Sequence, residues 1–332
     1  MSEYLSVDFE GGDQVGKGDA VRNLSLELAN EGLDVTVVSF PCYATAVGFA
    51  VRKVLKEDLL SRYDMDLKET TTAKMALFSL NRLEVLNSIL SSEKSDIYLF
   101  DRGPFSNALT IAYAISTGLS PQYQEGLALK ALSLDSYFRG SLGIDRCVIR
   151  LCNRDSSWSK EREEDADLHE SRDVQERSDS IYSIFSNMLG DSWIDIPSKN
   201  RDGWRDRGEI TKECLEFVKK KYNISSVETS KRPNYFSVVQ TLQNLYRGST
   251  VDSRALDLFM SSVGSNNKQL MYEISEIISK QAVNSVKDIA WYNEEIEGVV
   301  KDMLDDIPEL LFLLEDLYGE DFVIKFLKSV NR

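Results

Sequence analysis

The sequence predicts an α/β fold in which a five-stranded parallel sheet carries helices on both faces and is followed by an all-α region. Three observations predict it. Strand-like and helix-like segments alternate up to about residue 222. A glycine-rich turn joins the first strand to the first helix. From residue 235 onward, we find only helical patterns.

Five short apolar runs are the expected strands. The first, residues 4–9 (YLSVDF), runs directly into the glycine-rich turn. In the helix that follows, Val21, Leu24 and Leu28 have helical spacing, and Gly32 supplies a stop signal. The later strands and one long helix are expected at residues 34–40 (DVTVVSF), 96–102 (DIYLFDR), 145–151 (DRCVIRL) and 192–197 (SWIDIP), with the helix at about 70–90.

A change in character marks a domain boundary near residue 223. Residues 225–234 (SSVETSKRPN) are polar and contain a proline, which is typical of a linker. We therefore expect a first domain at 1–223, a linker at 224–234 and a helical domain at 235–332. The helical domain has no chemical motif, and three roles stay open for it: self-association, contact with a protein partner, or covering of the first domain.

The composition excludes several functional classes. A formal net charge of −15 at pH 7 argues against general binding of nucleic acid or of an anionic membrane. The four cysteines form no Cys-x-x-Cys pair, and a single histidine, His169, leaves little room for histidine-based metal or triad chemistry. The acidic N-terminus is unlike a signal peptide, and no apolar run reaches the length of about 18 residues that a membrane span needs. We therefore expect a cytoplasmic protein with reduced thiols.

Residues 9–21 read FEGGDQVGKGDAV, in which Gly11 to Lys17 have the G-x-x-x-x-G-K spacing of a phosphate-binding loop. In such a loop the backbone N–H groups converge on a phosphate, and the helix N-terminus adds a partial positive charge. Lys17 is the residue expected to reach the β- and γ-phosphates of ATP. The residues expected to bind ATP are Gly11, Gly12, Asp13, Gln14, Val15, Gly16, Lys17, Gly18 and Asp19.

Gly18 stands where this loop normally carries a Ser or Thr whose hydroxyl binds Mg²⁺. Three explanations are open. Mg²⁺ could keep an additional water and bind the nucleotide oxygens and one carboxylate. Asp19 or Asp101 could reach the metal, directly or through water. Alternatively, the site could bind nucleotide but catalyse poorly.

A second candidate site follows the third expected strand, in LFDRGPFSN (residues 99–107). Ligands of open α/β sheets bind at the carboxyl ends of the strands. A carboxylate there, Asp101, can position Mg²⁺ or the attacking phosphate, and the neighbouring Arg102 can bind a phosphate bidentately. A structural ion pair or a helix cap is the alternative interpretation of these two residues.

Five motifs, in order, resemble those of the thymidylate kinase family of P-loop nucleoside monophosphate kinases. They are FEGGDQVGK (9–17), FPCYATAVG (40–48), LFSLNRLE (77–84), DRGPFSN (101–107) and VQERSDSIY (174–182). The resemblance covers about residues 1–222. It implies a P-loop NTPase-type sheet, ATP as phosphate donor, Mg²⁺, a small-molecule nucleotide acceptor such as dTMP, and a homodimer.

The resemblance also implies roles for individual residues. Phe78 would stack on a pyrimidine and Arg82 would hydrogen-bond its carbonyl edge, which fits their shared helix face at a spacing of four residues. A core position and a surface salt bridge are the alternatives for these two. Asp13 would meet the deoxyribose 3′-hydroxyl, and Arg102 would hold the acceptor phosphate. The residues expected to bind the acceptor are Asp13, Phe40, Tyr43, Phe78, Arg82, Arg102, Phe105 and Tyr113.

Two further positions depart from the family pattern. Tyr43 stands where an arginine commonly helps to bind the acceptor phosphate, and Gln14 stands where some members carry a transition-state arginine. A lid at about residues 153–168 would then supply that arginine. The expected catalytic residues are Lys17, Asp101, Arg102, Arg154 and Arg162, with Lys160 as a further lid candidate and Arg177 in support from the helix that follows the lid. Three functions stay open: a dTMP kinase, a kinase for another nucleotide or nucleoside, and a nucleotide-binding module with weak or lost transfer.

Overall fold

The structure is a computed structural model that describes residues 4–12, 15–42, 46–56, 59–90, 95–142, 144–153, 172–200, 203–224 and 231–235, together with 270, 273 and 274. Five parallel strands form the centre of one sheet, in the order β5-β4-β1-β3-β2. They are β1 (Tyr4–Glu10), β2 (Val35–Ser39), β3 (Ile97–Asp101), β4 (Ile144–Asn153) and β5 (Trp193–Asn200). This sheet confirms the predicted α/β fold class and all five predicted strands, while the predicted all-α region lies almost entirely outside the described residues.

Two short strands extend the described sheet at its edges. β6 (Gly203–Trp204) pairs antiparallel with β5, and β7 (Asn234–Tyr235) pairs parallel with β2. Neither was predicted. The expectation of only helical structure from Tyr235 onward is therefore wrong at that residue, because two-residue edge strands carry no detectable alternation of apolar and polar residues.

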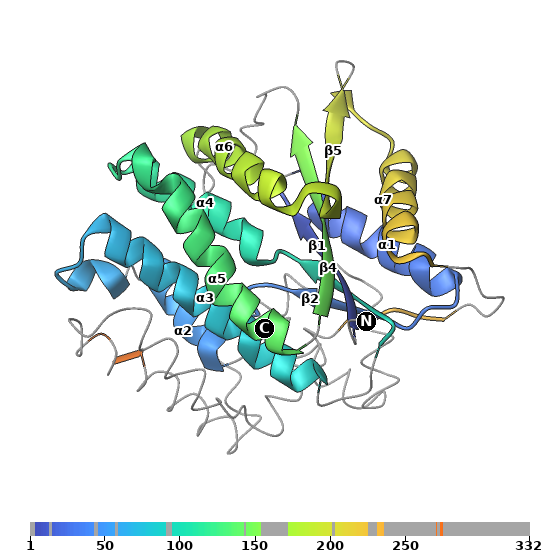
Figure 1. The fold of residues 1–332 in the computed structure, drawn as a ribbon, viewed down its shortest axis with the longest axis horizontal. Coiled ribbons are helices and arrows are strands. Elements are labelled where there is room, and N and C mark those ends of the chain that lie inside the picture. The colour runs from blue at the N-terminus through green and yellow to red at the C-terminus, as the bar shows by residue number, and fades with distance from the viewer. Residues whose placement is uncertain are drawn as a thin grey trace, which may run out of the picture.

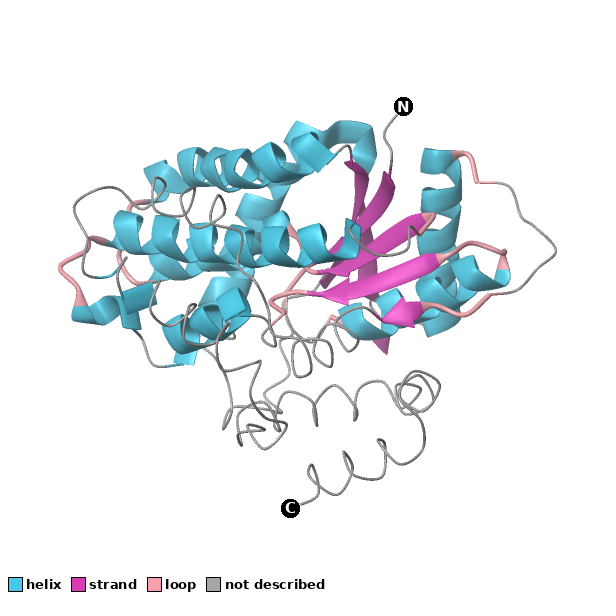
Figure 2. Ribbon diagram, turned by 90° about the horizontal axis from the view of Figure 1, so that it is seen from below, coloured by secondary structure: helices cyan, strands magenta, loops and turns pink. Residues whose placement is uncertain are grey.

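Helices cover both faces of the sheet (Figure 1). One face carries α1 and α7, which pack against each other, while α4, α5 and α6 cover the other face, with α2 and α3 alongside them (Figures 1 and 2). The helices are α1 (Lys17–Asn30), α2 (Ala46–Lys56), α3 (Leu67–Leu90), α4 (Asn107–Ser116), α5 (Gln124–Leu142), α6 (Arg172–Leu189) and α7 (Arg207–Tyr222). Short 3₁₀ turns lie at η1 (Leu59–Arg62), η2 (Pro104–Ser106), η3 (Pro121–Tyr123) and η4 (Gly190–Ser192).

The pleat of β1 separates an apolar face from a polar one. Val7 and Phe9 are buried in the core that α1 and α7 share with the sheet. Because successive side chains of a strand point to opposite faces, Ser6, Asp8 and Glu10 point to the other face. All three are fully buried. A central strand with a buried polar face directed toward its carboxyl end is a feature that a purely structural core does not require.

Two residues of the C-terminal region belong to the core of the first domain. Leu270 and Ile274 are fully buried in the apolar cluster formed by α2, η1 and α3. Between them, the carboxylate of Glu273 accepts a hydrogen bond from the hydroxyl of Tyr63 and lies 3.9 Å from the guanidinium of Arg62. These contacts place part of the C-terminal region against the first domain. The predicted boundaries at 223 and 235 stay predictions.

Among the helices that the structure describes, none is both long enough and apolar enough to span a membrane.

Candidate functional site

The glycine-rich turn leaves the carboxyl end of β1 and enters α1 at Lys17. Gly11 has φ 129°, and a Cβ there would lie 2.1 Å from the carbonyl oxygen of Leu151, so no other residue fits. Gly16 has φ 83° and caps α1 in the left-handed conformation. A Cβ at Gly12 would lie 2.2 Å from the Oε1 of Gln175 on α6. Close backbone packing therefore explains Gly11, the left-handed conformation explains Gly16, and at Gly12 the nearest atom is the movable end of the Gln175 side chain.

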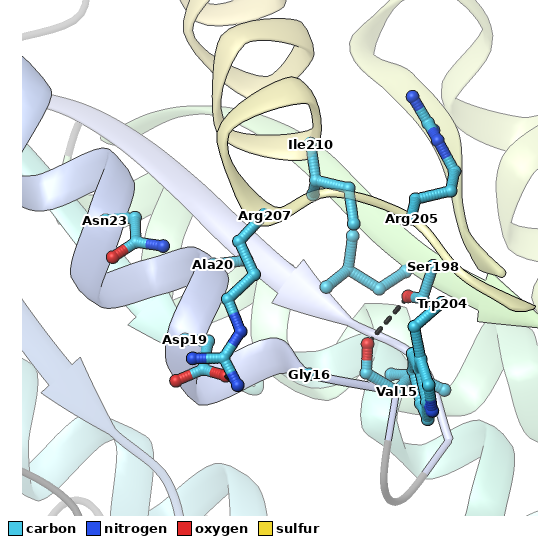
Figure 3. A pocket seen from close by; sticks show the side chains of 11 residues that line it. Val15, Gly16, Asp19, Ala20, Asn23, Ser198, Trp204, Arg205, Arg207 and Ile210 are labelled. Atoms are coloured by element: carbon cyan, nitrogen blue, oxygen red, sulfur yellow. Dashed lines mark hydrogen bonds and ion pairs between the residues drawn. The ribbon is translucent and has the colours of Figure 1, made fainter.

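Lys17 folds back over this turn. Its side chain is buried, and its Nζ donates to the carbonyl oxygen of Gly12 at 2.5 Å. The carbonyl of Val15 accepts a hydrogen bond from the hydroxyl of Ser198 at 2.6 Å, which ties the turn to β5 (Figure 3). Lys17 therefore brings a positive charge to the helix N-terminus, where backbone dipoles already favour an anion. Asp13 and Gln14 lie outside the described residues.

Asp101 and Arg102 end β3 beside this turn, because β1 and β3 are adjacent parallel strands. The Oδ1 of Asp101 is buried and has no hydrogen-bond partner in the described part of the chain. Arg102 has φ 68°, an uncommon conformation for a residue with a side chain. The two candidate sites predicted from separate stretches of sequence therefore meet at one edge of the sheet.

Glu10 is a site residue that the sequence reasoning missed. Its fully buried carboxylate accepts from the N–H of Gly103 at 2.8 Å and from the hydroxyl of Ser106 at 2.5 Å. Burial raises the pKa of Glu10 from 4.5 to about 7; the hydrogen bond from Ser106 opposes this rise, and the nearby carboxylate of Asp8 adds to it. A perturbed carboxylate at the edge that carries the candidate site is a functional candidate on physical grounds.

In the site predicted for the acceptor base, α3 places Phe78 and Arg82 on one helix face. Phe78 is half-buried against the cluster around α2 and α3. Arg82 is buried, and its guanidinium donates from Nε to Asp135 on α5 at 2.9 Å and from Nη2 to Ser79 at 3.0 Å. Asp135 also lies 3.5 Å from Arg146. Arg82 is thus held in a buried ion pair, and neither of the two alternatives, core position or surface salt bridge, describes it fully.

One turn before Phe78, the same helix carries a buried lysine that was not predicted. The Nζ of Lys74 lies 5.2 Å from the ring centroid of Tyr113 on α4, within cation–π distance. Lys74, Phe78 and Arg82 are each four residues apart, so they follow one stripe of α3. The half-buried Tyr113 contacts this stripe through Lys74, and its role in binding the acceptor stays a prediction.

Two of the predicted acceptor residues lie in the core instead. The ring of Phe105 is fully buried and packs edge-on against Phe185 and Trp193, at centroid distances of 5.3 and 5.4 Å. Phe40 is buried beside Phe100. Phe105 has no exposed surface and Phe40 is 6% exposed, so we assign both rings to packing. A motif gives positions in the chain and does not say which way a ring points.

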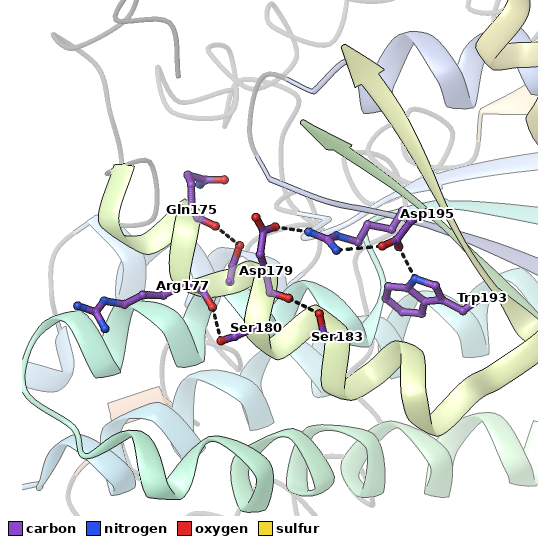
Figure 4. A network of polar contacts seen from close by, with 9 residues as sticks. Gln175, Arg177, Asp179, Ser180, Ser183, Trp193 and Asp195 are labelled. Carbon is purple, nitrogen blue, oxygen red and sulfur yellow. Dashed lines mark hydrogen bonds and ion pairs between the residues drawn. The ribbon is translucent and has the colours of Figure 1, made fainter. Parts of the chain in front are cut away.

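The expected lid falls largely outside the described residues. The lid candidates Arg154, Lys160 and Arg162 are among the residues that the structure does not describe. Tyr43, which precedes α2, is also outside the described residues. Arg177 on α6 is described: its guanidinium donates to Asp173 at 2.8 Å on an exposed helix face, directed away from the network around Asp195 (Figure 4).

A buried arginine on β4 was not predicted. Arg150 is the Cα partner of Glu10 across the sheet. Its guanidinium contacts Asp179 on α6, lies 3.3 Å from Asp195 on β5, and sits 4.6 Å from the ring centroid of Tyr182. The indole of Trp193 donates to the same Asp195 at 2.5 Å (Figure 4). This network fixes α6, and with it Gln175, against the turn that follows β1.

A cavity of about 490 Å³ opens on the other side of the turn (Figure 3). One wall is the start of α1, where the carboxylate of Asp19 pairs with Arg207 at 3.1 Å. Trp204, 58% exposed, forms part of the opposite wall, with the Nζ of Lys199 4.2 Å from its ring centroid. The lining residues are Val15, Gly16, Asp19, Ala20, Asn23, Leu151, Ser198, Trp204, Arg205, Arg207 and Ile210.

Sequence reasoning missed this cavity, although a signal was present. Residues 200–207 (NRDGWRDR) follow the fifth strand with an aromatic ring among arginines. Loops at the carboxyl edge of a parallel sheet commonly line its ligand site. The loop after β5 therefore carries the same kind of signal for a ligand site as the loops after β1 and β3.

No family model matches the chain. A protein of Invertebrate iridescent virus 6, provisionally named thymidylate kinase 251L, is 23% identical over 224 residues, which cover 67% of this chain and 91% of the viral protein. Among solved structures, a thymidylate kinase from Candida albicans aligns with 70% of this chain and 98% of its own, at 16% identity and a TM-score of 0.46. The chain is therefore similar to these two proteins over about two thirds of its length.

Proposed function

We propose that the protein transfers the γ-phosphoryl group of ATP to a pyrimidine deoxynucleoside monophosphate, converting dTMP to dTDP in the cytoplasm. One observation carries this proposal. The glycine turn with Lys17 folded over it and the Asp101–Arg102 turn lie side by side at the carboxyl edge of the sheet. Two phosphate-binding elements at one edge are what transfer between two phosphates requires.

The reaction needs little covalent help from the protein. An oxygen of the acceptor phosphate attacks the γ-phosphorus, the bond from that phosphorus to the β–γ bridging oxygen breaks, and ADP leaves. Backbone N–H groups of the glycine turn and the Lys17 ammonium would hold the donor phosphates, while Arg102 would hold the acceptor. Because the acceptor phosphate is itself the nucleophile, the reaction needs no histidine base.

Asp101 fits the place of a magnesium ligand. Its buried Oδ1 has no partner in the described part of the chain, and Mg²⁺ prefers carboxylate oxygen together with retained water. When bound, Mg²⁺ would neutralise charge on the β- and γ-phosphate oxygens. Asp19 is the weaker candidate, since it pairs with Arg207.

We assign the donor base to the cavity beside α1. It borders Val15 and Gly16 of the glycine turn and has room for a purine and its ribose. The exposed ring of Trp204 offers a stacking surface. The acceptor base belongs on the opposite side, along the stripe of Lys74, Phe78 and Arg82, where Asp135 and Ser79 fix the guanidinium.

The surroundings of Gly18 favour a second candidate function, a nucleotide-binding module with weak transfer. Gly18 is exposed on the first turn of α1, and no described atom lies within 4 Å of the position that its Cβ would take. In the described residues, no neighbouring side chain therefore occupies the place of the missing hydroxyl. Losing that Mg²⁺ ligand would slow transfer while leaving the backbone cradle for phosphate intact.

A coupled assay of ADP release distinguishes these functions. Purified protein is given ATP, Mg²⁺ and each deoxynucleoside monophosphate in turn. Turnover selective for dTMP supports the first proposal. Turnover with another acceptor would mean that the protein is a kinase for that nucleotide. ATP binding without turnover supports the second candidate. The Lys17→Ala variant should abolish turnover, and full activity in that variant would remove the glycine turn from the reaction.

The homodimer and a protein partner for the C-terminal region stay predictions. Size-exclusion chromatography with light scattering would measure the first.

A further inference from the structure

The turn after β3 is strained at the residue that bears the guanidinium. Arg102 has φ 68°, a left-handed conformation that is unfavourable for a residue with a Cβ. Its N–H donates to the carbonyl oxygen of Phe9 on β1 at 3.0 Å. Such a conformation persists where the surroundings fix it, and these residues cluster at functional sites. The contacts that fix this turn therefore bear on where the guanidinium points.

Glu10 makes two of those contacts. Its Oε1 accepts from the N–H of Gly103 at 2.8 Å, directly after Arg102, and its Oε2 accepts from the hydroxyl of Ser106 at 2.5 Å. The carboxylate is fully buried beneath the turn. One side chain of β1 thus joins both ends of the segment from Gly103 to Ser106.

Gly103 has no room for a side chain because of this arrangement. A Cβ there would lie 2.9 Å from the Cγ of Asp8 and 3.1 Å from the Oε1 of Glu10. The close approach of β1 to the turn explains the glycine here, and it shows that the turn rests directly on the two acidic side chains.

Four charged or titratable residues neighbour Glu10 in the described part of the chain. Asp8 lies on the same strand, Arg102 on the turn, Tyr182 on α6, and Arg150 is the Cα partner on β4. The guanidinium of Arg150 is engaged with Asp179 and Asp195. Glu10 is therefore directed to the turn by its hydrogen bonds.

We propose that Glu10 is a positioning residue for Arg102: its two hydrogen bonds hold the turn in the conformation that aims the guanidinium at the acceptor phosphate. This inference rests on the proposed function, because Arg102 acts on a phosphate only if the site binds one. Glu10 itself lies beneath the turn.

A double-mutant cycle tests the proposal. Steady-state kinetics are measured for the wild type, Glu10→Ala, Arg102→Ala and the double variant. A misplacement of about 1 Å can cost about a hundredfold in rate, so Glu10→Ala should lower kcat/KM for dTMP by about 10- to 100-fold. The KM for ATP should change by less than about twofold. In the Arg102→Ala background, Glu10→Ala should add less than about twofold, because a residue that acts through Arg102 has nothing left to position. An equal loss in both backgrounds overturns the proposal.

Conservative variants separate positioning from general destabilisation. A glutamine at position 10 can accept from Gly103 and donate to Ser106, so Glu10→Gln should recover most of the activity that Glu10→Ala loses. Ser106→Ala, which removes one of the two bonds, should fall between them. Glu125→Ala, at an exposed position on α5, is the matched control. If Glu10→Ala does not fold by circular dichroism, the Glu10→Gln and Ser106→Ala variants are measured in the same cycle. A Glu10→Gln variant as impaired as Arg102→Ala overturns the proposal.

Failure of the proposed function would be distinguishable. If the wild type turns over no acceptor, the Kd for dTMP of the same four proteins is measured by isothermal titration calorimetry. Non-additive losses of affinity still support the role of Glu10. Additive losses, or no binding of dTMP by the wild type, overturn it.

Discussion

The buried carboxylate of Glu10 should make the stability of the protein depend on pH, and a single substitution should remove that dependence. Burial raises the pKa of Glu10 from 4.5 to about 7 in the folded state. Because the folded pKa lies above the unfolded one, the folded state binds the proton more tightly between these two values. The contribution that this proton on Glu10 makes to the unfolding free energy is therefore fully present below pH 4.5 and is lost as the pH rises through 7.

The size of the effect follows from the two pKa values. One pKa unit corresponds to about 1.36 kcal/mol, so a rise from 4.5 to about 7 corresponds to about 3 kcal/mol, as an order of magnitude. The Glu10→Gln variant keeps the shape and both hydrogen bonds of the side chain but carries no charge at any pH. The difference in unfolding free energy, variant minus wild type, should therefore grow by about 3 kcal/mol between pH 4.5 and pH 8.

Urea denaturation followed by circular dichroism measures this difference at several pH values. Contributions from other titrating groups cancel in the difference, provided that those groups are unaffected by the substitution. Glu125→Gln, which removes an exposed carboxylate, is the matched control and should give a nearly flat difference. Parallel curves for Glu10→Gln and the wild type would refute the reasoning, since they would mean that the folded protein does not perturb this carboxylate.

Three further predictions concern the metal, the donor base and the C-terminal region. Gly18→Ser should raise the rate at limiting Mg²⁺ by about tenfold, because it restores a hydroxyl ligand at a site with open space. It should also stabilise α1 by about 0.5 kcal/mol. A dependence of the rate on Mg²⁺ concentration equal to that of the wild type would contradict the first expectation. Trp204→Ala should raise the KM for ATP by about tenfold, since loss of one aromatic–base stack costs about 1–3 kcal/mol, while Tyr123→Ala, at another exposed ring, should leave it unchanged. Leu270→Ala should lower the unfolding free energy by about 2–5 kcal/mol, whereas the exposed Leu129→Ala should change it by less than about 0.5 kcal/mol; equal effects in urea denaturation would show that the C-terminal region does not complete this core.

The local part of the site could be predicted from sequence because its signals are short. The glycine spacing from Gly11 to Lys17 encodes a turn between one strand and the next helix, and the structure forms it there. Asp101 and Arg102 were found because a charged pair at the end of an apolar strand points to the carboxyl edge of a sheet. The buried orientation of Phe105 and Phe40 could not be predicted, because the motif gives a position in the chain but no direction for the ring.

The sequence alone determined the alternation of strands and helices and the phosphate turn, because each depends on residues close together in the chain, and this alternation is typical of a parallel sheet. Only the tertiary structure decided which distant side chains meet. Glu10 reaches Gly103 across 93 positions, Arg82 reaches Asp135 across 53, and Ser198 reaches Val15 across 183. The order in which strands and helices pack sets these contacts. Because no local propensity specifies that order, the buried carboxylate beneath Arg102 and the cavity beside Trp204 emerge only when the sheet is assembled.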